Sequence, residues 1–375
     1  MSGIYIHIPF CKQACHYCDF HFSTSLKKKD ELIQALVKEL ELRKDELKNE
    51  IVETIYFGGG TPSVLSIDEL QLLIDNIYKN YTVIHKPEIT LEANPDDLTT
   101  KQIHNLSNTP INRLSIGIQS FFEDDLKSMN RAHNAQEAKQ CLELTTQFFD
   151  NITIDLIYGI PNMSLEKWNE NLHTAFSFGV NHISSYALTV EPKTALDRFI
   201  KKGEYPQMDE DLALAHFNHL VKATEEKEFI HYEISNFGKP DYLSRHNTSY
   251  WQGKEYLGIG PSAHSFNGKQ RSWNIANNTK YIQSIQKNNL PLTIETLSNN
   301  DRYNEYIMTG LRTIWGISLE KVESNFGLDL KTHLLVSAEI FIQQGLLKIS
   351  NSQVLTTTKK GKFLADGIAS ELFKI

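Results

Sequence analysis

Short apolar runs alternate with longer amphipathic stretches through the first half of the chain. Six of these runs are rich in β-formers, which predicts strands at Ile4–Ile8, Glu53–Phe57, Glu88–Glu92, Arg113–Ile118, Thr153–Ile157 and His182–Ala187. The stretches between them carry apolar residues at spacings of three and four, which predicts helices at Asp30–Asn49, Ile67–Tyr78, Thr100–Asn108, Ala135–Phe149 and Leu165–Phe178. Strands that alternate with helices through right-handed crossovers predict a parallel α/β sheet, curled into a barrel or most of one.

The pattern changes in the second half. Beyond Pro192 the alternation stops, and a predicted helix at Asp209–Lys227 leads into a polar, aromatic-rich stretch from Tyr232 to Phe266. The tail predicts helices at Tyr303–Arg312, Leu319–Phe326 and Leu330–Gln344, then an alternating segment at Leu347–Leu355 and a terminal helix. We therefore expect an α/β core at 1–190, an α+β extension of the barrel at 191–300 and a small winged-helix-like domain at 301–375.

Composition narrows the class of protein. With 375 residues, 40% of them hydrophobic, the chain can bury a large core. Its net charge of −8, without a basic stripe, does not indicate a nucleic-acid partner. We find no apolar run long enough to span a membrane and no signal-peptide pattern, so we expect a cytoplasmic protein.

Chemistry-bearing residues gather where the predicted strands end. The carboxyl ends of parallel strands meet on one face of a barrel, so these residues are expected to form one site. In strand order they are the cysteines after strand one, Gly58-Gly59-Gly60-Thr61-Pro62, Glu92, Gln119, Asp155 and Tyr186.

Three cysteines follow the first strand with the spacing Cys11-x-x-x-Cys15-x-x-Cys18. Three thiolates at this spacing can hold one face of a [4Fe-4S] cluster and leave one iron open to a small chelating molecule. A zinc site completed by His7, His16 or Asp19 is the alternative, although structural zinc sites usually need a second Cys pair. Cys141 lies in a helical pattern and is expected to be a buried structural thiol.

The surrounding motifs give a specific resemblance. The stretch Tyr5-Ile-His7-Ile-Pro9-Phe10-Cys11-x-x-x-Cys15-x-Tyr17-Cys18 resembles the signature of radical S-adenosylmethionine (SAM) proteins, especially the coproporphyrinogen oxidase-like group. Further matches are Tyr56-Phe57-Gly58-Gly59-Gly60-Thr61-Pro62, Glu92-Ala-Asn94-Pro95, Ser115-Ile-Gly117-Ile-Gln119, Arg131-Ala-His133, Asp155-Leu-Ile-Tyr158-Gly159 and Tyr232-Glu233-Ile-Ser235-Asn236-Phe237. The resemblance implies a radical SAM partial (β/α)6 barrel whose three cysteines bind a [4Fe-4S] cluster. It also implies that SAM is held by Tyr5, Gly60, Thr61, Glu92, Gln119, Arg131 and Asp155.

This group contains oxygen-independent coproporphyrinogen III oxidases and heme chaperones, which carry heme to an acceptor protein. Three features favour the chaperones: Phe20 stands where the oxidases have a further cysteine, the first strand begins at the start of the chain, and Arg245-His246-Asn247-Thr248-Ser249-Tyr250-Trp251 contains a His-Asn-x-x-Tyr-Trp motif. We therefore expect a heme carrier without oxidase activity, with the oxidase as the alternative. Imidazole is a common axial ligand of heme iron, so His246, and secondarily His264, are the candidate heme ligands.

Overall fold

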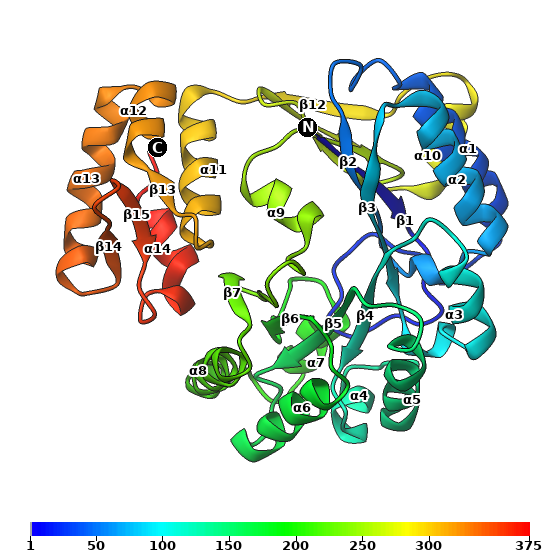
Figure 1. Cartoon of the computed structure of the whole chain (residues 1–375), viewed down its shortest axis with the longest axis horizontal. Coiled ribbons are helices and arrows are strands. Elements are labelled where there is room, and N and C mark those ends of the chain that lie inside the picture. The colour runs from blue at the N-terminus through cyan, green and yellow to red at the C-terminus, as the bar shows by residue number, and fades with distance from the viewer. Residues whose placement is uncertain (1) are drawn as a thin grey trace.

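All six predicted strands form neighbouring parallel strands in chain order, and their sheet curves around a barrel interior (Figure 1). The computed structural model describes residues 2–375. The strands are β1 (Ser2–Ile8), β2 (Val52–Gly59), β3 (Val83–Ala93), β4 (Arg113–Gln119), β5 (Ile152–Tyr158) and β6 (His182–Ala187). The connecting helices are α1 (Lys29–Leu42), α2 (Ile67–Asn80), α3 (Thr100–Ser107), α4 (Glu123–Ser128), α5 (Ala135–Thr145) and α6 (Leu165–Ser177), with 3-10 turns η1 (Pro62–Val64) and η2 (Pro95–Asp97).

Two helices end earlier than the sequence pattern predicts, and one short helix, α4, was not expected. Helix α1 ends at Leu42 rather than Asn49, and α5 at Thr145 rather than Phe149. After Leu42 the chain runs through turns while Arg43, only 1% exposed, points inward to polar partners. A buried guanidinium needs several acceptors, and a helical periodicity count does not include that requirement.

The segment after Pro192 extends this sheet at both edges instead of forming a separate unit. Beyond β6 lies β8, which is antiparallel to β6, and then β7, which is antiparallel to β8. Beyond β1 lie β9, β10, β11 and β12, of which β9 is parallel to β1. The added strands are β7 (Ile230–Glu233), β8 (Asn236–Gly238), β9 (Tyr256–Ile259), β10 (His264–Phe266), β11 (Gln270–Asn274) and β12 (Leu292–Thr296). The added helices are α7 (Ala195–Lys201), α8 (Glu210–Glu226), α9 (Arg245–Trp251) and α10 (Asn278–Gln286).

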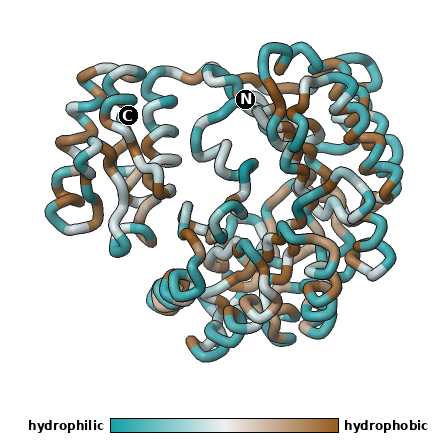
Figure 2. Tube along the Cα trace, in the orientation of Figure 1, coloured by the Kyte–Doolittle hydropathy of each residue, from teal (hydrophilic) through white to brown (hydrophobic). Residues whose placement is uncertain are grey.

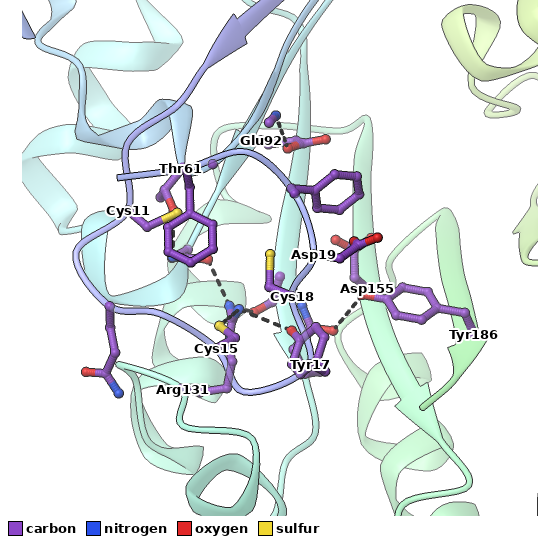
Figure 3. Close-up of a pocket in the computed structure, with 18 of the residues that line it drawn as sticks. Cys11, Cys15, Tyr17, Cys18, Asp19, Thr61, Glu92, Arg131, Asp155 and Tyr186 are labelled. Atoms are coloured by element: carbon purple, nitrogen blue, oxygen red, sulfur yellow. Dashed lines mark hydrogen bonds between the residues drawn. The ribbon is translucent and has the colours of Figure 1, made fainter. Parts of the chain in front are cut away.

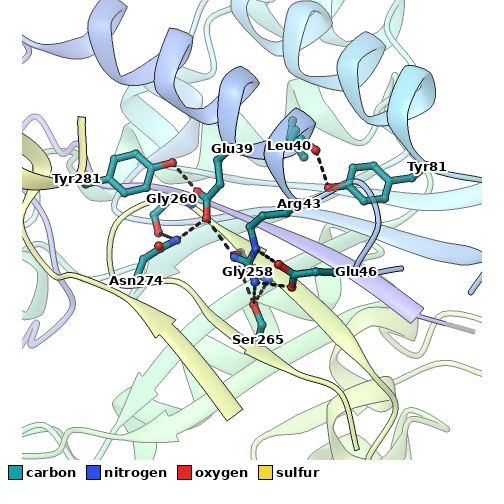
Figure 4. Close-up of polar contacts among 10 residues, drawn as sticks. All are labelled: Glu39, Leu40, Arg43, Glu46, Tyr81, Gly258, Gly260, Ser265, Asn274 and Tyr281. Atoms are coloured by element: carbon teal, nitrogen blue, oxygen red, sulfur yellow. Dashed lines mark hydrogen bonds and ion pairs between the residues drawn. The ribbon is translucent and has the colours of Figure 1, made fainter. Parts of the chain in front are cut away.

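A buried polar network fixes β9–β11 and α10 to helix α1 (Figure 4). Its centre is the fully buried Glu39 carboxylate, which accepts hydrogen bonds from Arg43 at 3.0 Å and Asn274 at 2.7 Å, and from Tyr281. Arg43 also donates to the carbonyl of Gly258 at 2.8 Å. Because a buried charge is tolerated only when it is paired and hydrogen-bonded, this network holds the extension in one position.

The last part of the chain has its own hydrophobic core, contributed by residues between Tyr303 and Leu372. It contains α11 (Asn299–Leu311), β13 (Ile317–Ser318), α12 (Leu319–Phe326), α13 (Leu328–Gln343), β14 (Leu347–Ile349), β15 (Val354–Thr357), η3 (Lys362–Leu364) and α14 (Ala365–Glu371). Its strands pair in the order β13-β15-β14, so helices followed by a small hairpin give the expected winged-helix-like arrangement. Figure 2 shows hydrophobic residues along the barrel strands and again within this domain. Among residues 2–375, no helix has the length and apolar character needed to cross a membrane.

Candidate functional site

The three motif cysteines line one pocket of about 420 Å³ at the carboxyl ends of β1–β6 (Figure 3). Cys11, Cys15 and Cys18 lie on the loop after β1, and Asp155 and Tyr186 face them from β5 and β6. The pocket also contains the predicted Gly60, Thr61, Glu92, Gln119 and Arg131. The closure of the barrel thus brings the five named residues from Cys11 to Thr61 beside residues as far along the chain as Tyr186.

Burial favours the protonated form of two of the pocket thiols, Cys11 and Cys18, in the ligand-free protein. Burial raises the pKa of Cys11, and it raises the pKa of Cys18 to about 12. Metal binding needs thiolates, so uptake of iron must displace these protons. The fourth cysteine, Cys141, is buried on α5 against Thr145, at a distance of 3.8 Å between sulfur and hydroxyl oxygen, and does not line the pocket.

Arg131 links the cysteine loop to the barrel. Its guanidinium donates to the Cys15 sulfur at 3.3 Å, to Asn94 Oδ1 at 2.8 Å and to the Gly117 carbonyl at 2.8 Å. Its buried Nε has no hydrogen-bond partner within residues 2–375. A buried guanidinium with an unused donor beside the pocket fits a ligand that carries a carboxylate.

Two carboxyl groups lie across the pocket from the cysteines. Glu92 accepts from the Tyr56 hydroxyl at 2.8 Å and from the Gly59 amide at 3.2 Å, and burial raises its pKa. Burial, together with the nearby Glu92, raises the pKa of Asp155 to about 7. A cationic ligand that also offers hydroxyl groups would stabilise the ionised form of these two buried carboxyls. SAM has an ammonium, a sulfonium and ribose hydroxyls, so the residues present fit SAM together with a three-cysteine cluster.

The backbone amides of the glycine-rich turn after β2 have partners within the protein, and contact of Gly60 and Thr61 with SAM stays a prediction. The Gly60 amide donates to the Ile8 carbonyl at 2.9 Å, and the Thr61 amide donates to the Phe10 carbonyl at 2.7 Å. These amides therefore hold the cysteine loop and are not free to meet a ligand. A Cβ added to Gly60 would lie 2.7 Å from the Phe10 carbonyl oxygen, so this close approach of two backbones requires glycine.

Tyr5 is the one predicted SAM-binding residue that does not line the cysteine pocket among residues 2–375, and its contact with SAM stays a prediction. Its side chain lines a second cavity instead of the cysteine pocket, donates to or accepts from His7 Nδ1 at 3.2 Å, and stacks on Tyr56. His7 and His16, the extra ligands of the zinc alternative, do not line the cysteine pocket, whereas Asp19 does. His7 Nε2 contacts the His21 carbonyl at 2.9 Å, and His16 Nδ1 contacts the Ser128 carbonyl at 3.1 Å. Within the described residues no three His, Cys, Asp or Glu side chains are arranged around a single metal ion.

The sequence motifs include Asn94, which lines the pocket, without assigning it a role, whereas Gln119 is one of the residues predicted to hold SAM. Asn94 bridges Arg131 and the Thr61 hydroxyl, the latter at 3.3 Å. Gln119 has a left-handed φ of 66° although it is not glycine, which is a strained backbone position typical of functional sites. The place of Asn94 in the motif Glu92-Ala-Asn94-Pro95 could have identified it from the sequence. The backbone angle of Gln119, in contrast, depends on the bulge between β4 and β5.

The second cavity is a cleft of about 1300 Å³ beside the cysteine pocket, between the β9–β11 side of the sheet and the C-terminal domain. Asp19 and Phe20 line both cavities, and Phe20 is 66% exposed. The other lining residues include Tyr250, Trp251, Tyr256, His264, Phe266, Arg271, Arg302, Tyr306, Met308 and Phe326. The cleft thus combines broad aromatic surfaces with two arginines and three histidines, His7, His21 and His264.

His264 and His246 occupy different environments. His264 lines the cleft with its ring stacked on Trp273 at 5.7 Å between centroids, and burial together with Arg271 lowers its pKa. Its ring nitrogens have no hydrogen-bond partner among residues 2–375. His246 is 2% exposed, and both of its nitrogens have partners: Thr54 Oγ1 at 2.7 Å and the Tyr250 hydroxyl at 2.8 Å. Iron coordination by His246 stays a prediction, and it would require one of these contacts to break.

Comparison with known proteins agrees with this geometry. The model of the radical SAM superfamily matches residues 5–175, and that of the HemN C-terminal domain matches residues 297–364. The protein named heme chaperone HemW of Bacillus subtilis is 33% identical over 380 residues, covering 98% of each chain. Its namesake from Escherichia coli K12 is 36% identical over 268 residues, covering 70% of this chain and 69% of that one.

Among solved structures, coproporphyrinogen III oxidase (HemN) from Escherichia coli, described as a radical SAM enzyme, superposes with a TM-score of 0.87. It covers 100% of this chain and 90% of its own, at 22% identity, so this similarity concerns the fold alone. The full-length sequence similarity is the stronger finding, since it spans both the barrel and the C-terminal domain. The chain belongs to the HemW family of the radical SAM superfamily.

Proposed function

We propose that the protein binds heme in the cleft and transfers it to an acceptor protein, while its cysteine pocket holds a SAM-ligated [4Fe-4S] cluster. The observation that carries this proposal is the cleft itself. Its volume of about 1300 Å³ lies above the range of about 300–1,000 Å³ usual for small-ligand pockets. A flat macrocycle with acidic side chains suits such a space because aromatic rings and arginines line it together.

The cleft residues suggest how heme is oriented. His264 and Phe266 alternate on β10, so both side chains lie on one face, and the register pairs Phe266 with Arg271 of β11. His264 is kept neutral by its lowered pKa and has a free nitrogen lone pair to offer iron. Arg271 and Arg302 can pair with propionates, as guanidinium groups do with carboxylates.

The cysteine pocket supports the second half of the proposal. Arg131 has an Nε donor without a partner among residues 2–375, and the buried carboxyls of Glu92 and Asp155 have raised pKa values. These groups fit the opposite ends of SAM. When bound, the cluster would supply an open iron for chelation and one-electron chemistry. Thiol-held iron also agrees with the reducing cytoplasm that we expect for this protein.

Anaerobic titration of the reconstituted full chain with hemin tests the proposal. We expect saturation near one heme per chain, and a Soret band that shifts or weakens in His264→Ala. His104→Ala, which removes an exposed histidine of α3 far from the cleft, is the matched control. Heme loaded in this way should transfer to apomyoglobin in less time than free hemin takes to aggregate. A chain that binds no heme, or whose binding is indifferent to every cleft substitution, contradicts the proposal.

The oxidase alternative has its own assay. Coproporphyrinogen III, SAM and an electron donor should give no protoporphyrinogen, because hydrogen abstraction tolerates little misplacement of the reacting carbon. Phe20 stands at the boundary between the two cavities, where the oxidase pattern has cysteine. Product formed over many turnovers would make the oxidase the primary function.

A further inference from the structure

Helix α9, which carries the His-Asn-x-x-Tyr-Trp motif, packs against β1 and β2 and lies between these strands and the C-terminal domain (Figure 1). Asn247 lines a polar cavity of about 150 Å³ inside the barrel, shared with Tyr56, Glu92 and Asp155. Tyr250 and Trp251, one turn further along the helix, line the cleft. The motif therefore faces two separate spaces, and His246 lies between them.

His246 is held by contacts on every side. Its backbone amide donates to Glu88 at 2.9 Å, Nδ1 meets the Thr54 hydroxyl at 2.7 Å, and Nε2 meets the Tyr250 hydroxyl at 2.8 Å. Burial lowers the pKa of His246 to about 3. The ring is consequently neutral, so one ring nitrogen donates to its hydroxyl partner and the other accepts from its own.

The contacts continue from His246 into both cavities. The ring of Tyr56 stacks on His246 at 4.8 Å between centroids, and the Tyr56 hydroxyl donates to Glu92, which lines the cysteine pocket. On the other side, the Tyr250 ring packs edge-on against Tyr256 at 4.5 Å, and both rings line the cleft. A continuous row of side chains thus joins the carboxyl expected to hold SAM to the aromatic wall expected to hold heme.

We propose that His246 is a positioning residue that couples the two cavities, so that SAM and heme change each other's affinity, and that it is not the iron ligand. This inference rests on the proposed function for its heme half. A planar ligand packed against Tyr250 acts on the hydroxyl that holds His246, and His246 in turn sets the position of Tyr56 and the hydrogen bond to Glu92. Coupling of this kind needs an element with two arrangements, and here it is the hydrogen bond between Tyr250 and His246, which is either formed or broken.

The mildest test removes one hydroxyl. Heme affinity of the cluster-reconstituted full chain is measured with and without saturating SAM, in the wild type and in Tyr250→Phe. We expect a wild-type ratio within the range of about 5–150-fold typical of coupled sites, and a ratio near one in the variant. Tyr242→Phe is the matched control, because its hydroxyl contacts Asp150 at 2.5 Å, away from both cavities. A wild-type ratio of one, or an unchanged ratio in Tyr250→Phe, overturns the coupling.

Two readouts of His246→Gln separate a positioning role from iron coordination. SAM affinity without heme should fall severalfold, since Tyr56 loses the ring against which it stacks. The ferric Soret position should stay that of the wild type, since the iron ligand is unchanged. Loss of the imidazole spectrum in this variant would make His246 the ligand and overturn the inference. If the wild type binds no heme at all, the proposed function fails, and an unchanged SAM affinity in His246→Gln then overturns the inference as well.

Discussion

The cysteine pocket and the cleft share Asp19 and Phe20, yet they are assembled in different ways. The pocket takes its lining from strand ends of one parallel barrel, all between Cys11 and Glu191. The cleft takes its lining from β1, the motif helix α9, the β10–β11 hairpin and the C-terminal domain, reaching to Phe326. The carboxyl ends of parallel strands lie together on one face of a barrel. Separate elements come together only if other contacts fix their packing. The pocket is thus a property of the barrel, and the cleft is a property of the whole chain.

The largest expected effect concerns the pocket alone. Replacing Cys11, Cys15 or Cys18 by Ala should remove the iron, expected at about four per chain for a cubane cluster, because each thiolate would be one of only three protein ligands. Iron analysis and the brown absorbance of anaerobically prepared protein measure this. Cys141→Ala is the matched control and should keep its iron. One zinc per chain and no iron in the wild type would contradict the cluster.

The next effect tests whether the cleft depends on the network around α1. Arg43→Met leaves the buried Glu39 carboxylate without its charge partner, and breaking a buried pair in this way costs about 3–5 kcal/mol of unfolding free energy. Denaturant unfolding measures it, with the exposed neighbour Lys44→Met as control. Because the network fixes β9–β11, the folded variant should lose heme affinity more than SAM affinity. Equal losses at both sites would show that the two cavities are not independently supported.

A smaller effect should be confined to the cleft. Arg271→Gln should weaken heme binding by about ten- to a hundredfold, since hydrogen bonds to charged groups contribute about 1.5–3 kcal/mol. SAM affinity should stay at the wild-type value. Exposed Arg198→Gln, on α7, controls for the loss of a surface charge. Heme binding that does not respond to Arg271 would place the propionates elsewhere.

The smallest effect is a pH dependence of the pocket. The pKa of Asp155 is raised to about 7 in the ligand-free protein, and SAM's positive charge favours the ionised carboxylate. SAM affinity should therefore rise with pH below about 7, by at most about tenfold per pH unit, and level off above it. Asp155→Asn should flatten this profile, while exposed Asp124→Asn should not. A wild-type affinity that is flat between about pH 6 and 8 would show that Asp155 does not titrate against the ligand.

The sequence alone determined the barrel and most of its pocket. Strand periodicity located all six parallel strands, and their common polarity brings Glu92, Gln119 and Asp155 to the cysteine loop. Local pattern suffices here because residues that end successive parallel strands have nowhere else to lie. The same pattern could not show that the amides of Gly60 and Thr61 are used by the cysteine loop, since that pairing joins backbones far apart in sequence.

Only the tertiary structure decided the cleft and the environment of each histidine. Tyr5 lines the cleft, and β9 pairs with β1 on the side away from β2. The alternation of residues along β1 does not show which strand lies beside it. Arg271 meets Glu305 of α11 only after the C-terminal domain packs beside the hairpin. His246 looked like an available ligand in its motif, but packing of α9 against β1 and β2 gave both ring nitrogens partners. Periodicity reports which residues are buried, and long-range packing alone determines what a buried polar group contacts.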